Sequence, residues 1–367
     1  MSKQQYIDQA VNHYRELLLA QIDRAEKMNG APAPEKKEKT VIGVVGGDGI
    51  GPIITYQAQR ALEALLKNEI QAGTIEIRAI EGLTIENRLA VGKAIPDDVL
   101  LKGPTTTPSG GELLESANVA LRRELDLYAN VRPVCVPEEG IDWMFFRENT
   151  EGEYALGSKG IEIPGLLTMD FKVTTIAGTR RIARAAFEYA RKNGKTHVAI
   201  VTKSNIMKKT DGMFSVLCRE IAAEYPEIQA DEYFIDIMTA NLLKTNMRNQ
   251  LQVFLMPNLY GDILTDEAAQ IQGGVGTAGS ANTGDRYAMF EAIHGSAPRM
   301  IARGMGDYAN PESILRAAVM LLRHIGLGDK ADQLSAAIET ANQTSPITGT
   351  REGATCAQFG DAVIAAL

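Results

Sequence analysis

The sequence predicts an α/β protein, because patterns typical of strands alternate along the chain with patterns typical of helices. Apolar runs that favour buried strands occur at 41–45, 74–80, 198–202 and 252–257. Segments with helical character occur at 212–225, 311–325 and 330–341. At 367 residues, the chain is long enough for two domains or for one large domain with a substantial core.

Composition and charge exclude several classes of protein. The formal net charge is −8 and Lys and Arg form no long run, so nucleic acid is not an expected partner. No apolar run is long enough to span a membrane, and the N-terminus lacks the apolar segment of a secretory signal. The three well-separated cysteines, Cys135, Cys218 and Cys356, indicate neither a disulfide framework nor a zinc site. We therefore expect a cytoplasmic protein without a membrane partner.

Residues 6–27 predict a helix, and a Pro-rich, charged linker at 29–40 separates it from the rest of the chain. This helix either packs on a partner subunit or covers an apolar patch of its own domain. After the linker, the strand at 41–45 runs into a glycine-rich turn at 46–52. The full dinucleotide-binding fingerprint of a Rossmann fold is not met, so we expect a tight strand-to-helix turn that borders a cofactor.

Two aspartates four residues apart indicate a metal site. Asp262 and Asp266 follow the buried strand at 252–257 and lie at the start of a predicted helix over 262–270, so both carboxylates share one helical face. Oxygen ligands suit Mg²⁺ or Mn²⁺. The alternative is that both acids stabilise the helix N-terminus. Asp236 interrupts another apolar run, and a metal would compensate for burying its carboxylate.

Three arginines at the ends of apolar elements indicate a pocket for a polycarboxylate. A guanidinium group binds a carboxylate through two hydrogen bonds, and Ser116 and Asn118 lie close in sequence to the first arginine. The arginines are Arg122, Arg132 and Arg147. The alternative is structural ion pairing with the nearby acids Glu124, Asp126 and Glu148.

Tyr154 and Lys208 are candidates for proton transfer. A tyrosine and a lysine near a metal ion can exchange protons with a substrate once their pKa values are lowered. Taken singly, each residue is equally compatible with an ordinary place on the surface.

Five ordered segments resemble the isocitrate/isopropylmalate dehydrogenase family of metal-dependent β-decarboxylating dehydrogenases. They are SANVALRRELDLYANVRP at 116–133, FFRENTEGEY at 145–154, NIMKKTDG at 205–212, NLYGDILTD at 258–266 and FEAIHGSAP at 290–298. The resemblance covers roughly residues 41–367. It implies a fold distinct from the Rossmann fold, with two domains and an active-site cleft between them.

The resemblance also implies a domain division and a homodimer with shared active sites. The large domain would comprise 41–127 and 273–367, and the small domain 128–151 and 181–272. Residues 152–180 would form a clasp or arm at the dimer interface, and 1–40 the N-terminal helix and linker.

Each candidate site residue receives an implied role. The substrate carboxylates would bind Ser116, Asn118, Arg122, Arg132 and Arg147, and protons would be handled by Tyr154 and Lys208. Mg²⁺ or Mn²⁺ would bind Asp236, Asp262 and Asp266, with Lys208 and Asp236 supplied by the second subunit. The cofactor site would be lined by Thr106, Thr107, Glu291, His294, Gly295, Ser296, Ala297 and Asn310.

The implied reaction is oxidative decarboxylation of isocitrate, a tricarboxylate, to 2-oxoglutarate and CO₂ with reduction of NAD or NADP. The Ser-x-Asn pattern at 116–118 favours isocitrate, because a hydroxyl and an amide can hydrogen-bond a third carboxylate. Homoisocitrate or 3-isopropylmalate dehydrogenase is the enzymatic alternative. A non-catalytic regulatory subunit of a hetero-oligomeric dehydrogenase is the alternative of another class, but the joint presence of metal and proton-transfer residues favours activity.

The choice of nucleotide is less sharply indicated. Arg299 directly follows the HGSAP segment, and TGTR at 348–351 lacks the Asp of the NAD-like pattern. An arginine can bind a 2′-phosphate, so these positions favour NADP. Met300 is not the usual NADP partner, which leaves NAD open. The chain also departs from its relatives at Ile53, where they have Glu, and in a short junction at 95–104.

Overall fold

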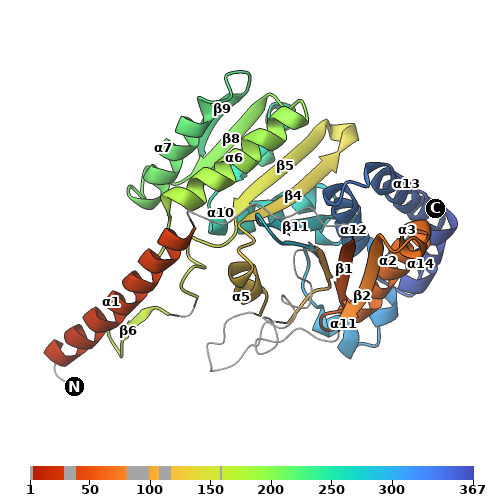
Figure 1. The fold of residues 1–367 in the computed structure, drawn as a ribbon, viewed down its shortest axis with the longest axis horizontal. Coiled ribbons are helices and arrows are strands. Elements are labelled where there is room, and N and C mark those ends of the chain that lie inside the picture. Colours follow the sequence, from red (N-terminus) through yellow and green to blue (C-terminus); the bar gives the residue numbers. More distant parts are fainter. Residues whose placement is uncertain (1–2, 29–38, 81–98, 107–116, 158) are drawn as a thin grey trace. The chain divides into compact units, whose positions relative to one another are not determined.

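The computed structural model describes residues 3–28, 39–80, 99–106, 117–157 and 159–367, which divide into two compact units (Figure 1). Unit 1 contains the described residues within 1–33 and 139–264, and unit 2 contains those within 34–109, 116–138 and 265–367. The predicted α/β class is confirmed. Ser116, Thr107 and residues 95–98 of the short junction at 95–104 lie outside the described residues.

Unit 1 is built on a parallel sheet with strand order β5-β10-β8-β9. Its elements are α1 (Lys3–Lys27), β5 (Ile141–Glu148), β6 (Ile161–Ile163), β7 (Leu167–Met169), α6 (Ile176–Lys192), β8 (His197–Thr202), α7 (Thr210–Ala222), β9 (Gln229–Phe234), α8 (Ile235–Leu242), α9 (Thr245–Arg248), β10 (Val253–Met256) and the first half of α10 (Asn258–Ile271). Strand β10 is buried along its whole length, as its uninterrupted apolar sequence predicts. Helix α6 buries Ala183, Ala186, Phe187 and Ala190, whose helical spacing gives one apolar face.

Unit 2 contains a mixed sheet with strand order β2-β1-β3-β12-β11-β4. Its elements are β1 (Thr40–Val45), α2 (Gly51–Leu65), α3 (Lys67–Gln71), β2 (Ile75–Ile80), β3 (Val99–Lys102), α5 (Ala117–Glu124), β4 (Ala129–Val136), β11 (Gly279–Thr283), β12 (Ala288–Ala292), α11 (Pro298–Ala302), α12 (Glu312–His324), α13 (Gly328–Thr344) and α14 (Cys356–Ala365). Short 3₁₀ turns cover Pro137–Glu139, Val275–Thr277 and Gly306–Tyr308. Strand β11 runs antiparallel to both of its neighbours, so this sheet differs from the all-parallel sheet of a Rossmann domain.

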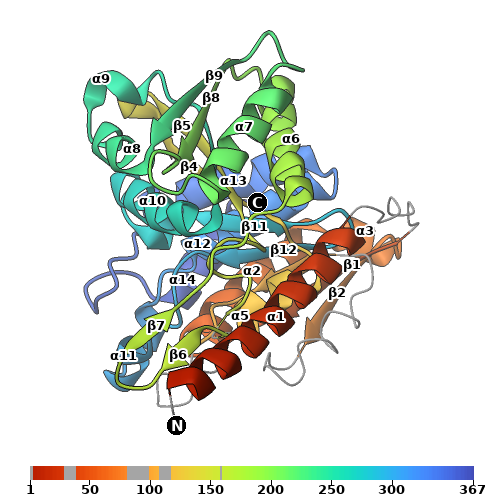
Figure 2. The same ribbon diagram turned by 90° about the vertical axis from the view of Figure 1, so that its left-hand side faces the viewer.

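Helix α1 covers part of its own unit. It lies alongside the β6–β7 hairpin in both views (Figures 1 and 2). The rings of Tyr14 and Phe171 are 5.3 Å apart, and Leu17 is buried. The coverage is partial, because Val11, Leu18 and Leu19 remain exposed, so both roles stay open for the helix. Among the described helices, none is both long and apolar enough to cross a membrane.

The start of α10 differs from the sequence prediction. The helix begins at Asn258, directly after Pro257, and not at Asp262. Asp262 and Asp266 therefore lie beyond the first helical turn, which contains no acidic residue. Because the field of a helix N-terminus falls off within that turn, stabilising the helix end does not explain this pair of aspartates.

Candidate functional site

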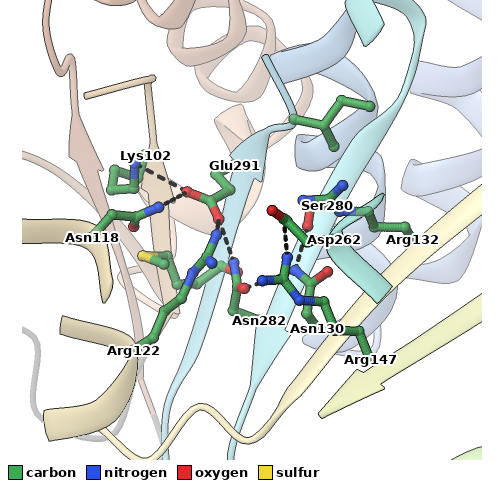
Figure 3. A network of polar contacts seen from close by, with 12 residues as sticks. Lys102, Asn118, Arg122, Asn130, Arg132, Arg147, Asp262, Ser280, Asn282 and Glu291 are labelled. Carbon is green, nitrogen blue, oxygen red and sulfur yellow. Dashed lines mark hydrogen bonds and ion pairs between the residues drawn. The ribbon is translucent and has the colours of Figure 1, made fainter. Parts of the chain in front are cut away.

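The carboxylate of Glu291 organises a buried polar cluster in unit 2 (Figure 3). Its oxygens contact Lys102 Nζ at 3.0 Å and Arg122 Nη2 at 2.5 Å. Asn282 Nδ2 and Asn118 Nδ2 donate to it over 2.7 and 3.3 Å. Burial alone would raise the pKa of Glu291, but Arg122 and Lys102 hold it well below its ordinary value. This carboxylate therefore stays ionised throughout the physiological pH range.

Strand register places these polar groups together. Lys102 on β3 lies opposite Glu291 on β12, and Ser280 on β11 faces Glu291 from the other side. Asn282 on β11 pairs with Asn130 on β4, and Asn130 Nδ2 donates to Ser280 Oγ and Asn282 Oδ1 at 2.8 Å each. Lys102, Asn130, Ser280 and Asn282 were not predicted from the sequence as members of this cluster. Their signal is a polar residue within an otherwise apolar strand, which acquires meaning once the strand neighbours are known.

Two predicted substrate residues, Asn118 and Arg122, belong to this cluster. Arg122 pairs with Glu291, an acid distant in sequence. Asn118 Oδ1 is buried and accepts no hydrogen bond from the described residues. Since an unpaired buried oxygen is costly, it is a natural acceptor for a donor on a ligand. Glu291, predicted to line the cofactor site, thus fixes two groups predicted to bind substrate.

Arg147 and Asp262 form the corresponding centre in unit 1. Arg147 is buried, and its Nε and Nη2 donate to Asn258 Oδ1 over 2.9 and 2.6 Å. Its Nη1 contacts Asp262 Oδ1 at 2.5 Å, as Figure 3 shows. Tyr154 Oη donates to the other oxygen of Asp262 over 3.1 Å. Position 261 requires glycine, because a Cβ there would lie 2.5 Å from Arg147 Cγ.

Arg132 makes a similar pair in unit 2. Its Nη1 donates to Thr265 Oγ1 over 2.6 Å and to Asp266 Oδ1 over 3.1 Å. Two arginines predicted to bind substrate therefore pair one to one with two aspartates predicted to bind metal. Asn258 and Thr265, which were not predicted, hold the guanidinium groups in place.

Asp262 and Asp266 are chemically suited to Mg²⁺ or Mn²⁺. They present carboxylate oxygens one turn apart on α10, and their side chains are 43% and 61% exposed. Hard divalent cations prefer such oxygen ligands. Within the described part of the chain, no three His, Cys, Asp or Glu residues gather closely enough to hold a metal ion.

The prediction that Asp236 is buried was wrong. The run at 234–238 is not a single strand, because β9 ends at Phe234 and α8 begins at Ile235. Asp236 lies in the first turn of α8, where its side chain is 61% exposed and contacts Lys203 Nζ at 2.5 Å. It therefore needs no metal to compensate for burial, although its carboxylate remains accessible to one.

Lys208 lies on an exposed turn between β8 and α7. The buried carboxylate of Asp211 shapes this turn, since its Oδ2 accepts from the backbone N–H of Lys203 over 2.7 Å. Its Oδ1 lies 2.6 Å from Lys172 Nζ. Lys208 is therefore held on a well-anchored turn with its side chain directed to the surface.

The predicted cofactor residues surround the glycine-rich turn after β1. Asp48 Oδ2 accepts from the N–H of Thr106 over 2.7 Å, and Thr106 Oγ1 lies 2.7 Å from Ser296 Oγ. Gly49 has φ of 58°, and a Cβ there would lie 2.1 Å from Ser296 O. The turn therefore contacts two of the predicted cofactor residues, Thr106 and Ser296. Ala297 adopts a left-handed conformation, with φ of 45°, which is uncommon for a residue other than glycine.

Two cavities in unit 2 share Ala297 and Met300. One, of about 420 Å³, is lined by Ile50, Val275, Gly276, His294, Gly295, Ala297, Met300, Ala309 and Asn310. The other, of about 470 Å³, is lined by Ala297, Pro298, Arg299, Met300, Arg303, Met305 and Gly349. Together they offer a surface for an elongated ligand, with arginines at one end.

The loop between Arg147 and Tyr154 is held by two buried glutamates, Glu148 and Glu151. Glu148 accepts from the N–H of Thr150 over 3.0 Å and from the N–H of Glu151 over 2.6 Å. Burial raises the pKa of both carboxyl groups. For Glu151, burial and then the charge of Glu148 raise the pKa to about 7.

The folded protein is expected to lose less stability between pH 5 and pH 8 when Glu151 is replaced with Gln. Glu151 keeps its proton up to about pH 7 in the folded protein but loses it near pH 4.5 when unfolded. The folded state therefore binds more protons within this window, so its stability falls as pH rises through it. The Tm of Glu151→Gln relative to wild type should rise between pH 5 and pH 8. Glu188→Gln is the control: hydrogen bonds from Tyr225 and Arg191 lower the pKa of Glu188, so the effect of this substitution on Tm should be constant over this range. An equally constant difference for Glu151→Gln would contradict the prediction.

Comparisons with known proteins agree on one family. The family model described as isocitrate/isopropylmalate dehydrogenase matches residues 41–363. The probable mitochondrial isocitrate dehydrogenase NAD subunit alpha of Drosophila melanogaster is 36% identical over 360 residues, which cover 93% of this chain and 92% of that protein. The NADP isocitrate dehydrogenase of Rickettsia felis is 41% identical over 312 residues, 80% of this chain and 61% of that protein. The crystal structure of isocitrate dehydrogenase from Methylococcus capsulatus matches with a TM-score of 0.78 and 33% identity, over 89% of this chain and 99% of that chain. With a family match over most of its length, the chain belongs to the isocitrate/isopropylmalate dehydrogenase family.

Proposed function

We propose that this protein catalyses the oxidative decarboxylation of isocitrate to 2-oxoglutarate and CO₂, with a nicotinamide cofactor as hydride acceptor. The observation that carries this proposal is the set of three anchored arginines, Arg122, Arg132 and Arg147, each held by a carboxylate. Their number matches the three carboxylates of isocitrate. Asn118 Oδ1, which accepts no hydrogen bond from the described residues, supports recognition of a further polar group.

The arginine–aspartate pairs suit the binding of an anionic substrate together with a metal cation. A substrate carboxylate can replace Asp262 as the partner of Arg147, and a cation can replace Arg147 as the partner of Asp262. The same exchange applies to Arg132 and Asp266. Charge balance is kept in both states, so neither a guanidinium nor a carboxylate is left without a counter-ion.

Proton transfer is assigned to Tyr154 and Lys208. Lys208 would accept the proton of the substrate hydroxyl as hydride leaves, and Tyr154 would protonate the carbon that loses CO₂. The phenol of Tyr154 already donates to Asp262, which supports its place beside the reacting groups. When bound, Mg²⁺ or Mn²⁺ lowers the pKa of the substrate hydroxyl and stabilises the negative charge that follows loss of CO₂. Asp262 and Asp266 would hold it, with Asp236 from a second subunit.

The first test is absorbance at 340 nm with purified protein, Mg²⁺ and isocitrate, with NADP and NAD in parallel. Reduction of either nucleotide is expected, and a chelator should abolish it reversibly. Reduction with homoisocitrate or 3-isopropylmalate alone would overturn the choice of substrate. No reduction with any of the three would instead favour a regulatory subunit.

We propose NADP as the preferred nucleotide. The described lining of the 470 Å³ cavity contains Arg299 and Arg303 and no carboxylate. Gly349 also lines this cavity. It belongs to the segment 348–351, whose sequence favours NADP over NAD. Two guanidinium groups would bind a 2′-phosphate through charge-assisted hydrogen bonds.

Replacing both arginines by serine is expected to lower kcat/KM for NADP by about 10- to 100-fold, since each lost charge-assisted bond costs about 1.5–3 kcal/mol and exposure weakens it. The value for NAD should change by about threefold at most. Steady-state kinetics with both nucleotides measure the two effects. Arg323→Ser, which removes an exposed arginine paired with Asp332, is the matched control. Equal losses for both nucleotides would show that these arginines do not read the 2′-phosphate.

We also propose a homodimer in which Lys208 and Asp236 serve the partner's site. Large apolar residues near these two polar side chains are exposed in the single chain, among them Ile206, Met207 and Ile237. A partner subunit would cover such residues. The lack of a three-ligand group among the described residues also fits a metal site divided between subunits. The domain division and a cytoplasmic location remain predictions. The two compact units differ from the predicted domains, because residues 128–138 and 265–272 belong to unit 2.

A further inference from the structure

Helix α1 lies outside the region matched by the family model, yet it contacts the loop that joins two site residues. This loop runs from Arg147 to Tyr154. Near the C-terminal end of α1, Arg24 Nη2 donates to Thr150 Oγ1 over 3.0 Å. The same nitrogen lies 4.0 Å from Glu151 Oε1.

The carboxylate of Glu151 is rigidly held in its buried position. Its Oε1 accepts from Thr175 Oγ1 over 2.5 Å and its Oε2 from the N–H of Thr175 over 2.8 Å. A Cβ at position 178 would lie 2.4 Å from Oε1, so Gly178 makes room for this carboxylate. Above its pKa of about 7 this buried carboxyl group is ionised and needs a counter-ion, and Arg24 supplies positive charge beside it.

A continuous series of hydrogen bonds leads from Glu151 to the site. The backbone carbonyl of Glu151 accepts from Asn258 Nδ2 over 3.0 Å. The other end of the Asn258 side chain accepts two hydrogen bonds from Arg147. Arg147 in turn contacts Asp262. The guanidinium orientation at the site therefore depends on where the backbone of Glu151 lies.

We propose that Arg24 is a positioning residue for the substrate site, through which helix α1 sets the orientation of Arg147 by way of Glu151 and Asn258. The inference rests on the proposed function, because it is read out with isocitrate. Helix α1 thus takes part in substrate binding without touching substrate. The expected signature is a change in KM, because Arg147 binds a carboxylate that is present in both the ground state and the transition state.

A double-mutant cycle at pH 8, where the carboxyl group of Glu151 is ionised, tests the proposal. Arg24→Met should raise KM for isocitrate by about three- to tenfold with kcat changed less than about twofold, a coupling typical of residues remote from a ligand. In a Glu151→Gln background, Arg24→Met should have no further effect, because a neutral Gln needs no counter-ion. Arg15→Met removes an exposed arginine from the same helix and should leave KM unchanged.

The other outcomes are distinguishable. An active wild type in which Arg24→Met matches Arg15→Met overturns this inference alone. A wild type that reduces neither nucleotide with isocitrate overturns the proposed function and this inference with it. If Arg24→Met fails to fold, Glu151→Gln is compared with the double variant. Equal KM values for Glu151→Gln and the double variant then support the inference. A higher KM for the double variant, or a double variant that does not fold, overturns it.

Discussion

Replacing Asp262 with Asn is expected to lower kcat/KM for isocitrate by about a thousandfold. The magnitude follows from loss of charge stabilisation at the reacting centre, where removal of one such group costs about 10²–10³ in rate and a metal contributes further. Steady-state kinetics over a range of Mg²⁺ concentrations measure it. The variant should also need more Mg²⁺ for half-maximal rate.

The effect is large because three interactions converge on Asp262. One oxygen contacts Arg147 and the other accepts from Tyr154. The same carboxylate is the proposed ligand of the metal ion. An Asn keeps the shape but loses the charge, so the guanidinium loses its counter-ion and the cation loses a ligand.

Asp142→Asn is the matched control for this experiment. Asp142 is an exposed carboxylate of unit 1 paired with Lys195, and it has no place in the proposed site. Its replacement should leave kcat/KM and the Mg²⁺ requirement unchanged. If Asp262→Asn resembled this control, Asp262 would be a structural partner of Arg147 and the metal site would have to be sought elsewhere.

Local patterns predicted the elements of this fold well. The helix over 311–325 corresponds to α12 and the strand over 41–45 to β1, because each is long or apolar enough to be determined by its own residues. The apolar run at 234–238 misled, since it spans the end of a strand and the start of a helix. Local hydrophobicity does not mark such a boundary, so the exposure of Asp236 could not be predicted.

The partners of the candidate site residues are set by register and could not be read from the sequence. Lys102 and Glu291 face each other because β3 and β12 are neighbours, although 188 residues separate them in the sequence. Asn258 is equally inconspicuous in sequence, yet it links the backbone of Glu151 to Arg147. Most charged residues of the site were therefore predictable, although Lys102 was not. The amides of Asn130, Asn258 and Asn282 acquire their roles only through the fold.

Lys208→Met and Tyr154→Phe are each expected to reduce turnover by at least about a hundredfold, because each removes a proton-transfer group. When the two variants are co-expressed with different tags, the isolated heterodimer should regain about half of the wild-type activity. If Lys208 serves the partner's site, one site of the heterodimer contains both substitutions and the other contains neither. The activity of the tagged heterodimer at 340 nm measures this recovery.

The pairing of Lys208→Met with Asp236→Asn separates shared sites from simple mutual stabilisation. Both residues are proposed to act on the partner's site, so each site of this heterodimer receives one substitution and none is intact. We expect no recovery in this pair, although its subunits have the same opportunity to stabilise each other. Recovery in neither pair would mean that each chain builds its own site. In that case the exposed Ile206, Met207 and Ile237 would have to be explained by a contact other than a shared active site.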